Sequence, residues 1–292
     1  MVRKIFALGF FDGVHLGHQA LLSACRDLAE TLGCVPGAVT FAGHPDTLIT
    51  GNTPKLINTP ADRCRLLEQY GMQEILTIPF DRKLMAMPWQ EFIEMLLRQG
   101  AAGFVCGEDF RFGHRGEGTA QMLAEYCTEK GLACTVVPEQ TRSGIRISST
   151  CIRALLEEGN MAEATAFLGH PHILTGAVVT GRQLGRTIGI PTANVLIPEE
   201  VEVPKLGVYA SLCCVEGKKY PAVTNIGSRP TVGGHQIRAE SWLLDFAGDL
   251  YGKTVTLEFY QFLRPETKFS SLEELEKEIR KNGEETRKFF EK

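Results

Sequence analysis

The hydrophobic pattern of this 292-residue chain changes character once, and that change limits the folds open to it. In the first half, short apolar runs alternate with helical stretches, and glycine or proline separates most of them. Buried strands separated by helices are typical of a parallel sheet covered on both faces. Further on, strand-like runs follow one another without helices, which is typical of an antiparallel sheet or small barrel. We therefore expect an α/β domain over residues 1–169 and a β domain over residues 170–292.

The expected strands and helices follow from these runs and from the glycine and proline residues that separate them. In the first half, strands are expected at residues 5–8, 38–41, 75–78, 104–106 and 134–137. Helices are expected at 19–32, 61–70, 89–98 and 119–130, with two shorter ones between 148 and 168. In the second half, strands are expected at 173–180, 209–215, 220–224, 237–246 and 254–262, before an amphipathic helix at 271–290. Ligands of a parallel sheet bind beyond the carboxyl ends of its strands, so a first site is expected there.

Composition argues against several function classes. With 31 basic and 35 acidic residues, the net charge of −4 leaves no basic excess for nucleic-acid binding. No apolar run approaches the roughly 20 residues that span a bilayer, and no signal-peptide cleavage pattern follows the first apolar stretch. The nine cysteines are an odd number and form no CxxC pair, so reduced thiols are expected. We therefore expect a cytoplasmic protein that binds neither nucleic acid nor membrane.

The run GFFDGVHLGH, residues 9–18, leads from the first predicted strand into a helix. A helix N-terminus offers free N–H groups and a positive dipole end, which suits a nucleotide phosphate. The glycines of this run allow close approach of the backbone, and His15 and His18 could donate hydrogen bonds to a reacting phosphoryl group. The alternative is an ordinary strand-to-helix turn that carries two surface histidines.

Two later stretches of the first half could complete that site. The run CGEDFRFG, residues 106–113, ends in a turn in which Asp109 could bind a ligand or merely cap a loop. The run RISSTCIR, residues 146–153, puts hydroxyl groups at a helix start between Arg146 and Arg153. Guanidinium groups bind phosphate in a bidentate manner, which favours a phosphate clamp, whereas a serine at this place could simply cap the helix.

In the second half, the glycine-rich run at residues 181–194 is the main candidate for chemistry. Such a loop could fold over phosphates while the Thr192 hydroxyl and the Asn194 carbonyl reach Mg²⁺, a cation that prefers oxygen ligands. A flexible turn is the alternative. Glu240 lies further on in a strand-like run, where most acidic residues simply face solvent.

Taken in order, these motifs resemble those of prokaryotic bifunctional riboflavin kinase/FAD synthetases. The HxGH and ISSTxIR elements occur in many nucleotidyltransferases, and their combination with GEDFRFG is more specific. The PTAN run at 191–194, the run around Glu240 and the RPETKF run at 264–269 are similar to the riboflavin kinase module. The resemblance covers nearly the whole chain. It implies a Rossmann-like nucleotidyltransferase domain with a parallel sheet, followed by a small antiparallel β-barrel with a closing helix.

For the C-terminal module, the resemblance implies phosphorylation of riboflavin to FMN with ATP as co-substrate. Glu240 would be the general base that takes the proton from the terminal ribityl hydroxyl, and Thr192 and Asn194 would hold Mg²⁺. The glycine-rich loop would cover the phosphates with Gly181, Gly185, Arg186 and Gly189.

For the N-terminal module, the resemblance implies transfer of AMP from a second ATP to FMN, which gives FAD and pyrophosphate. His15 and His18 would stabilise the transition state at the α-phosphate. The residues expected to bind the nucleotide and the leaving phosphates are Gly9, Phe11, Gly17, Asp109, Arg146, Ser149, Thr150 and Arg153.

Three other interpretations stay open. The N-terminal half could bind flavin or nucleotide without transferring AMP, because Ala42 and Gly43 precede His44 where the family usually has an acidic residue and a proline. A nucleotidyltransferase for a different phosphate ester would explain the first half but neither PTAN nor Glu240. The pair His15-x-x-His18 could bind a metal, but no spaced cysteine or carboxylate completes such a site.

Overall fold

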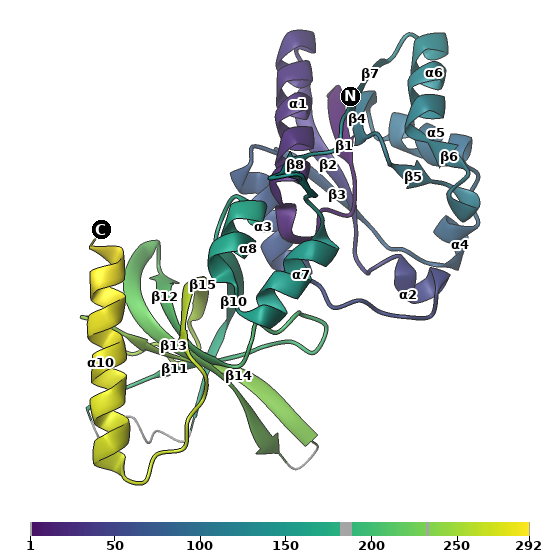
Figure 1. Cartoon of the computed structure of the whole chain (residues 1–292). Helices are drawn as coiled ribbons and strands as arrows, with labels where there is room; N and C mark the ends of the chain where they lie inside the picture. Colours follow the sequence, from purple (N-terminus) through teal and green to yellow (C-terminus); the bar gives the residue numbers. More distant parts are fainter. Residues whose placement is uncertain (1, 182–188, 232–233, 292) are drawn as a thin grey trace. The chain divides into compact units, whose positions relative to one another are not determined.

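The computed structural model describes residues 2–181, 189–231 and 234–291 (Figure 1). By its internal contacts the chain divides into two compact units. The first unit comprises Met1–Leu56 and Arg63–Ser149, and the second comprises Ile57–Asp62 and Thr150–Lys292. The boundary expected at residue 169 divides the chain by catalytic module and not by internal contacts. It stays a prediction.

The first unit is built on a parallel five-stranded sheet in the order β3-β2-β1-β4-β7. The strands are β1 (Lys4–Leu8), β2 (Val35–Phe41), β3 (Glu74–Ile78), β4 (Ala101–Gly107) and β7 (Ala133–Val137). The longer helices are α1 (Leu16–Leu32), α3 (Pro60–Gln69), α5 (Trp89–Arg98) and α6 (Ala120–Lys130). Each matches a strand or helix expected from the sequence, so the predicted α/β architecture is confirmed.

Alternation along β1 divides the core of this sheet between its two faces. Phe6 and Leu8 join the buried cluster that includes Phe92 of α5 and Leu123 of α6. On the other side, α1 packs against the sheet, and the thiol of its buried Cys25 donates to the Ile5 carbonyl. The loops at the carboxyl ends of the strands are therefore carried by a sheet that is covered on both faces.

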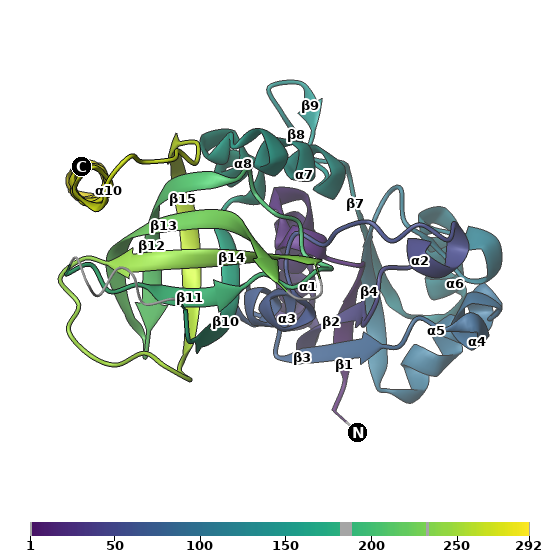
Figure 2. The same ribbon diagram turned by 90° about the horizontal axis from the view of Figure 1, so that it is seen from below.

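The second unit contains a closed antiparallel barrel in the strand order β10-β11-β14-β13-β12-β15 (Figure 2). Its strands are β10 (His172–Val179), β11 (Ala193–Leu196), β12 (Gly207–Val215), β13 (Lys218–Thr231), β14 (Gly234–Leu243) and β15 (Thr254–Arg264). The closing helix α10 (Leu272–Phe290) packs on β12 and β13. The predicted barrel with a C-terminal helix is confirmed.

A polar chain crosses the interior of this barrel. The buried hydroxyls of Ser211, Thr224 and Ser241, on β12, β13 and β14, are linked by oxygen–oxygen distances of 2.6 and 2.7 Å. Ser211 also donates to the Ala222 carbonyl at 2.9 Å. Satisfied buried hydroxyls fix the pairing of neighbouring strands, because a shift of register would leave polar atoms without partners.

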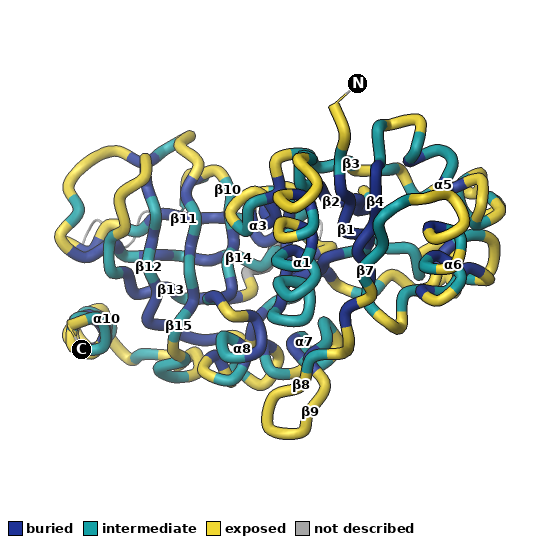
Figure 3. The backbone as a smooth tube through the Cα atoms, turned by 90° about the horizontal axis from the view of Figure 1, so that it is seen from above, coloured by how far each residue is buried: buried dark blue, intermediate teal, exposed yellow. Residues whose placement is uncertain are grey.

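Two helices, α7 (Ser149–Glu158) and α8 (Met161–Leu168), precede the barrel, as expected from the sequence. Asn160 caps α8, since its side chain accepts the Glu163 N–H. Helix α8 packs on β10 and β15, so it belongs to the barrel unit by its contacts. In Figure 3 the central strands of each unit are mostly buried and many connecting loops are exposed.

Several elements were not expected from the sequence. The first unit also contains the short helices α2 (Asp46–Ile49) and α4 (Arg82–Met85), the turns η1 (Asp12–Val14) and η2 (His114–Gly116), and the short strand pairs β5 (Arg111–Phe112) with β6 (Gly118–Thr119) and β8 (Thr141–Arg142) with β9 (Ile145–Arg146). In the barrel, β11 occupies residues that the sequence suggested were loop, and β13 extends well beyond the expected residues 220–224. Across the described residues, no helix is long and apolar enough to cross a membrane.

Candidate active sites

The turn after β1 is strained. Phe11 and Val14 have φ angles of 60° and 40°, in the left-handed region that side chains rarely adopt. Both side chains are fully buried, and the Thr40 hydroxyl donates to the Phe10 carbonyl at 2.8 Å, so packing and hydrogen bonding hold the turn. Backbone strain of this kind is found preferentially at functional sites, which points to this turn as one.

His15 is the N-cap of α1, and its Nδ1 accepts the His18 backbone N–H at 3.3 Å. Because Nδ1 is an acceptor, the neutral ring carries its proton on Nε2. The two imidazole rings stack with centroids 3.7 Å apart. A side chain at Gly17 would begin 3.1 Å from the His15 ring, so the glycine of the HxGH run leaves room for this ring.

His18 is held as a neutral imidazole. Burial, followed by the influence of His15 and Arg63, lowers the pKa of His18 well below its ordinary value of 6.5. The edge of the ring meets the Phe11 ring, with centroids 5.2 Å apart. The side chain therefore offers a hydrogen bond to a ligand without adding a positive charge.

A cavity of about 420 Å³ opens at the carboxyl edge of the sheet, beside this turn. It is lined by segments that follow β1, β2, β4 and β7. The predicted residues that it brings together are Gly9, His15, Gly17, His18, Asp109, Arg146 and Ser149. Phe11 lies buried behind His18 instead of lining the cavity. A crevice at this edge is where parallel α/β sheets bind nucleotides.

Arg146 is engaged by two carboxylates. It forms ion pairs with Asp109 and with Glu139, the latter at 2.8 Å, and the side chain is half exposed. Asp109 is therefore more than a loop cap, because its carboxylate pairs with Arg146 and both residues line the cavity. The two carboxylates hold the Arg146 guanidinium in one orientation before a ligand arrives. An incoming phosphate would then replace them as the partner of Arg146.

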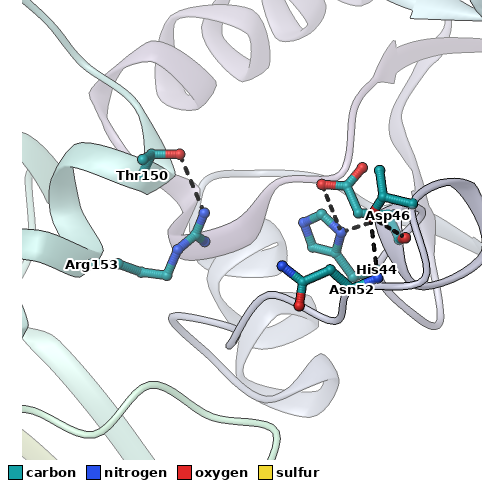
Figure 4. A network of polar contacts seen from close by, with 6 residues as sticks. His44, Asp46, Asn52, Thr150 and Arg153 are labelled. Atoms are coloured by element: carbon teal, nitrogen blue, oxygen red, sulfur yellow. Dashed lines mark hydrogen bonds and ion pairs between the residues drawn. The ribbon is translucent and has the colours of Figure 1, made fainter.

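The start of α7 is tied to the turn through Ser149, whose hydroxyl donates to the Asp12 carbonyl at 3.0 Å. In the second unit, Arg153 donates to the Thr150 hydroxyl at 3.4 Å (Figure 4). Figure 4 also shows the contacts of His44 in the first unit, where its Nδ1 accepts the Asp46 N–H at 3.1 Å. The His44 ring meets the Phe10 ring edge-on, with centroids 4.7 Å apart.

A second cavity, of about 330 Å³, lies in the barrel unit and has mostly apolar walls. Glu240 and Trp242 line it from β14, and Leu272, Leu275 and Ile279 line it from α10. Asn194 and Asn225 pair with Glu240 from the strands on either side of β14, which places the three side chains on one face. An apolar cavity with a carboxylate at its wall suits a flat aromatic ligand that bears a hydroxyl group.

Thr192 lines this cavity and also a third one, of about 320 Å³. The walls of the third cavity include Leu243 and the loop at residues 246–251, which the sequence did not single out as a site. Gly181 approaches Asn194 so closely that a side chain at Gly181 would begin 2.6 Å from the Asn194 amide. Gly189 has a φ of +70°, and the predicted residues Gly185 and Arg186 lie outside the described residues.

Within the described residues, no three His, Cys, Asp or Glu side chains gather as a metal site, so His15 and His18 are not part of such a cluster. A parallel sheet with an HxGH turn at its carboxyl edge, and a barrel with a carboxylate in an apolar cavity, define a two-domain transferase that handles phosphate-bearing substrates.

Comparison with known proteins gives the family. Residues 2–151 match the family model described as FAD synthetase, and residues 168–290 match the one described as riboflavin kinase. A bifunctional riboflavin kinase/FMN adenylyltransferase from Listeria monocytogenes is 35% identical over 100% of this chain and 94% of its own length. The protein of the same name from Escherichia coli is 37% identical, covering 98% of this chain and 92% of the relative. This chain belongs to the family of bacterial bifunctional riboflavin kinase/FMN adenylyltransferases.

A solved structure shares the whole fold. The crystal structure of a protein named macrolide-efflux protein, from Streptococcus pneumoniae, superposes with a TM-score of 0.87 at 32% identity. The match covers 98% of this chain and 94% of that one, so both units are shared.

Proposed function

We propose that this protein phosphorylates riboflavin to FMN in the barrel and joins FMN to AMP in the α/β unit, with modules at residues 170–292 and 1–169. The observation that carries this assignment is that each unit holds its own cavity and that the two cavities are built differently. The one with a carboxylate and apolar walls is in the barrel, and the one with two imidazoles and an arginine is at the sheet edge.

In the kinase reaction, Glu240 takes the proton from the terminal ribityl hydroxyl, and that oxygen attacks the γ-phosphate of ATP. The isoalloxazine ring lies in the apolar cavity between β14 and α10, next to Trp242. Nucleotide occupies the neighbouring cavity near the loop at residues 246–251, because Thr192 lines both cavities and a phosphoryl group must pass between them. Most of the acceleration comes from positioning of the two substrates.

The oxygen donors near Glu240 fit a bound Mg²⁺. Thr192 has a hydroxyl, and Asn194 has a side-chain carbonyl and lies opposite Glu240. Oxygen ligands of this kind suit Mg²⁺, which binds few protein ligands together with substrate phosphates. When bound, the ion would neutralise charge on the transferred phosphate.

In the adenylyl transfer, an oxygen of the FMN phosphate attacks the α-phosphate of ATP and pyrophosphate leaves. His15 and the neutral His18 donate hydrogen bonds to the charge that develops on the α-phosphate. Arg146 and Ser149 line the same cavity and bind the leaving phosphates. Thr150 and Arg153, which come next in α7, are proposed to bind these phosphates too. Asp109 orients Arg146 and contacts the nucleotide.

The test is chromatography of products after incubation with ATP and Mg²⁺, started once from riboflavin and once from FMN. Formation of FMN and then FAD is expected from riboflavin, and FAD is expected from FMN. FMN accumulation without conversion of supplied FMN, in oxidised or reduced form, would limit the α/β unit to binding. If neither product formed, the proposal would be wrong.

A further inference from the structure

Arg63 is a buried arginine behind the wall of the adenylyl-transfer cavity. It lies in α3, and the residue is only 1% exposed. Its Nη2 donates to the carbonyl of Phe41 at the end of β2, and its guanidinium lies over the Phe10 ring at 4.4 Å from the centroid. Phe10 and Phe41 both line the cavity, so the charge is fixed directly behind it.

The other two nitrogens of this guanidinium make no hydrogen bond within the described part of the chain. Nε and Nη1 are buried and have no hydrogen-bond partner among the described residues. Buried N–H groups without a partner are costly, so native structures seldom keep them without a reason. A guanidinium nitrogen can only donate, and the matching partner must be an acceptor.

His18 has the complementary feature. Its Nδ1 is likewise buried and has no partner among the residues that the structure describes. In a neutral imidazole with its proton on Nε2, Nδ1 is an acceptor. His15 already has this arrangement, because its Nδ1 accepts the His18 N–H.

We propose that Arg63 is a positioning residue that donates to Nδ1 of His18 across one buried water, and thereby keeps the His18 proton on Nε2. Both histidines of the HxGH run then present an Nε2–H donor, one fixed by the backbone and the other by Arg63. This inference rests on the proposed role of His18 in adenylyl transfer.

The electrostatic surroundings favour the same protonation state. Arg63 and His15 both act to lower the pKa of His18, after the larger effect of burial. Asp12, in the same turn, acts on the guanidinium of Arg63. The other charged side chains around the cavity are Glu108, Asp109, Arg111, Glu139 and Arg146. A donor with a fixed tautomer needs no reorganisation when charge develops on the substrate.

The first experiment is NMR of the whole protein with ¹⁵N-labelled histidine, in which His18→Gln assigns the His18 signals. In the unsubstituted protein, Nε2 of His18 should be protonated and Nδ1 should be bare at neutral pH. In Arg63→Met, which keeps an unbranched apolar stem but removes the guanidinium, the two tautomers should mix and the pKa of His18 should rise. A bare Nε2 in the unsubstituted protein, or a tautomer unaffected by Arg63→Met, would overturn the proposal.

The second experiment is a double-mutant cycle on FAD formation from FMN. Arg63→Met should lower kcat by roughly 10- to 100-fold, the range typical of residues that orient a functional histidine. In a His18→Ala background the same change should have little further effect. If the two losses multiply instead, Arg63 does not act through His18. Full activity of His18→Ala would disprove the role of His18 itself, so the two failures are distinguishable.

The matched control is Arg65→Met, which makes the same change at an exposed position of α3 and should leave FAD formation unchanged. Riboflavin phosphorylation reports whether each variant retains a folded barrel. If Arg63→Met does not fold, Arg63→Lys takes its place, because lysine keeps the charge and a donor. The tautomer of His18 in the unsubstituted protein then decides whether the proposal holds.

Discussion

Asn194 and Glu240 lie directly opposite each other on the neighbouring antiparallel strands β11 and β14. Asn225 pairs with Glu240 from the other side, on β13. Register therefore brings an amide of the PTAN run next to the carboxylate proposed as the base of the kinase reaction. It also turns both side chains toward the same face of the barrel wall.

Glu240→Gln should abolish FMN formation and leave the conversion of supplied FMN to FAD intact. The amide keeps the size of the side chain but cannot accept the proton of the ribityl hydroxyl, and loss of a general base typically costs about 10²- to 10⁴-fold in rate. The measurement is the rate of each product from its own substrate. Loss of both reactions would mean that Glu240 has a structural role instead.

His18→Ala should have the opposite effect, stopping FAD formation while FMN accumulates from riboflavin. Removal of one preorganised donor to the transition state lowers kcat by about 10²- to 10³-fold. Steady-state kinetics with FMN as substrate checks this, and the unchanged rate of riboflavin phosphorylation serves as control. An unaltered yield of FAD would contradict the assignment.

Arg146→Ala should weaken the use of ATP in FAD formation. Hydrogen bonds to charged groups contribute about 1.5–3 kcal/mol each, so kcat/KM for ATP should fall by roughly 10- to 100-fold. Arg142→Ala is a control, because Arg142 is an exposed residue of the same β8–β9 hairpin that does not line the cavity. Equal losses in the two variants would indicate a general effect on the hairpin.

Acid should destabilise the barrel through His172. Burial of this residue, which is 1% exposed, lowers its pKa to about 3, and its Nδ1 has no partner among the described residues. Because the unfolded chain binds a proton below pH 6.5 and the folded one does not, stability is lost as the pH falls from 6.5 toward the folded pKa. At pH 5 the loss should reach roughly 2 kcal/mol.

Urea unfolding followed through Trp242 fluorescence, in a Trp89→Phe background, measures this loss. His172→Leu should flatten the dependence of the unfolding free energy on pH between 6.5 and 5. Replacement of the exposed His114 by leucine should keep the dependence. If the slope persists in His172→Leu, another group causes the acid sensitivity.

Much of the fold could be predicted because its causes are local. The change from alternating strands and helices to successive strands follows from hydrophobic periodicity, and the Asn160 cap from side-chain chemistry. The elements that were missed have weak local signals. Strand β11 begins within the PTAN run, where proline and a polar asparagine suggest a loop, and pairing with β10 and β14 overrides that preference.

The sequence by itself determined the two-part architecture, the HxGH turn and the motifs that identify the family. These features depend on the order and spacing of residues along the chain. Only the tertiary structure decided that Arg63 is buried against Phe10 and Phe41 of the cavity wall, that Arg146 pairs with Asp109, and that Asn194 faces Glu240. Such relationships arise from strand register and burial between distant segments, and local preferences carry no information about which distant side chains will meet.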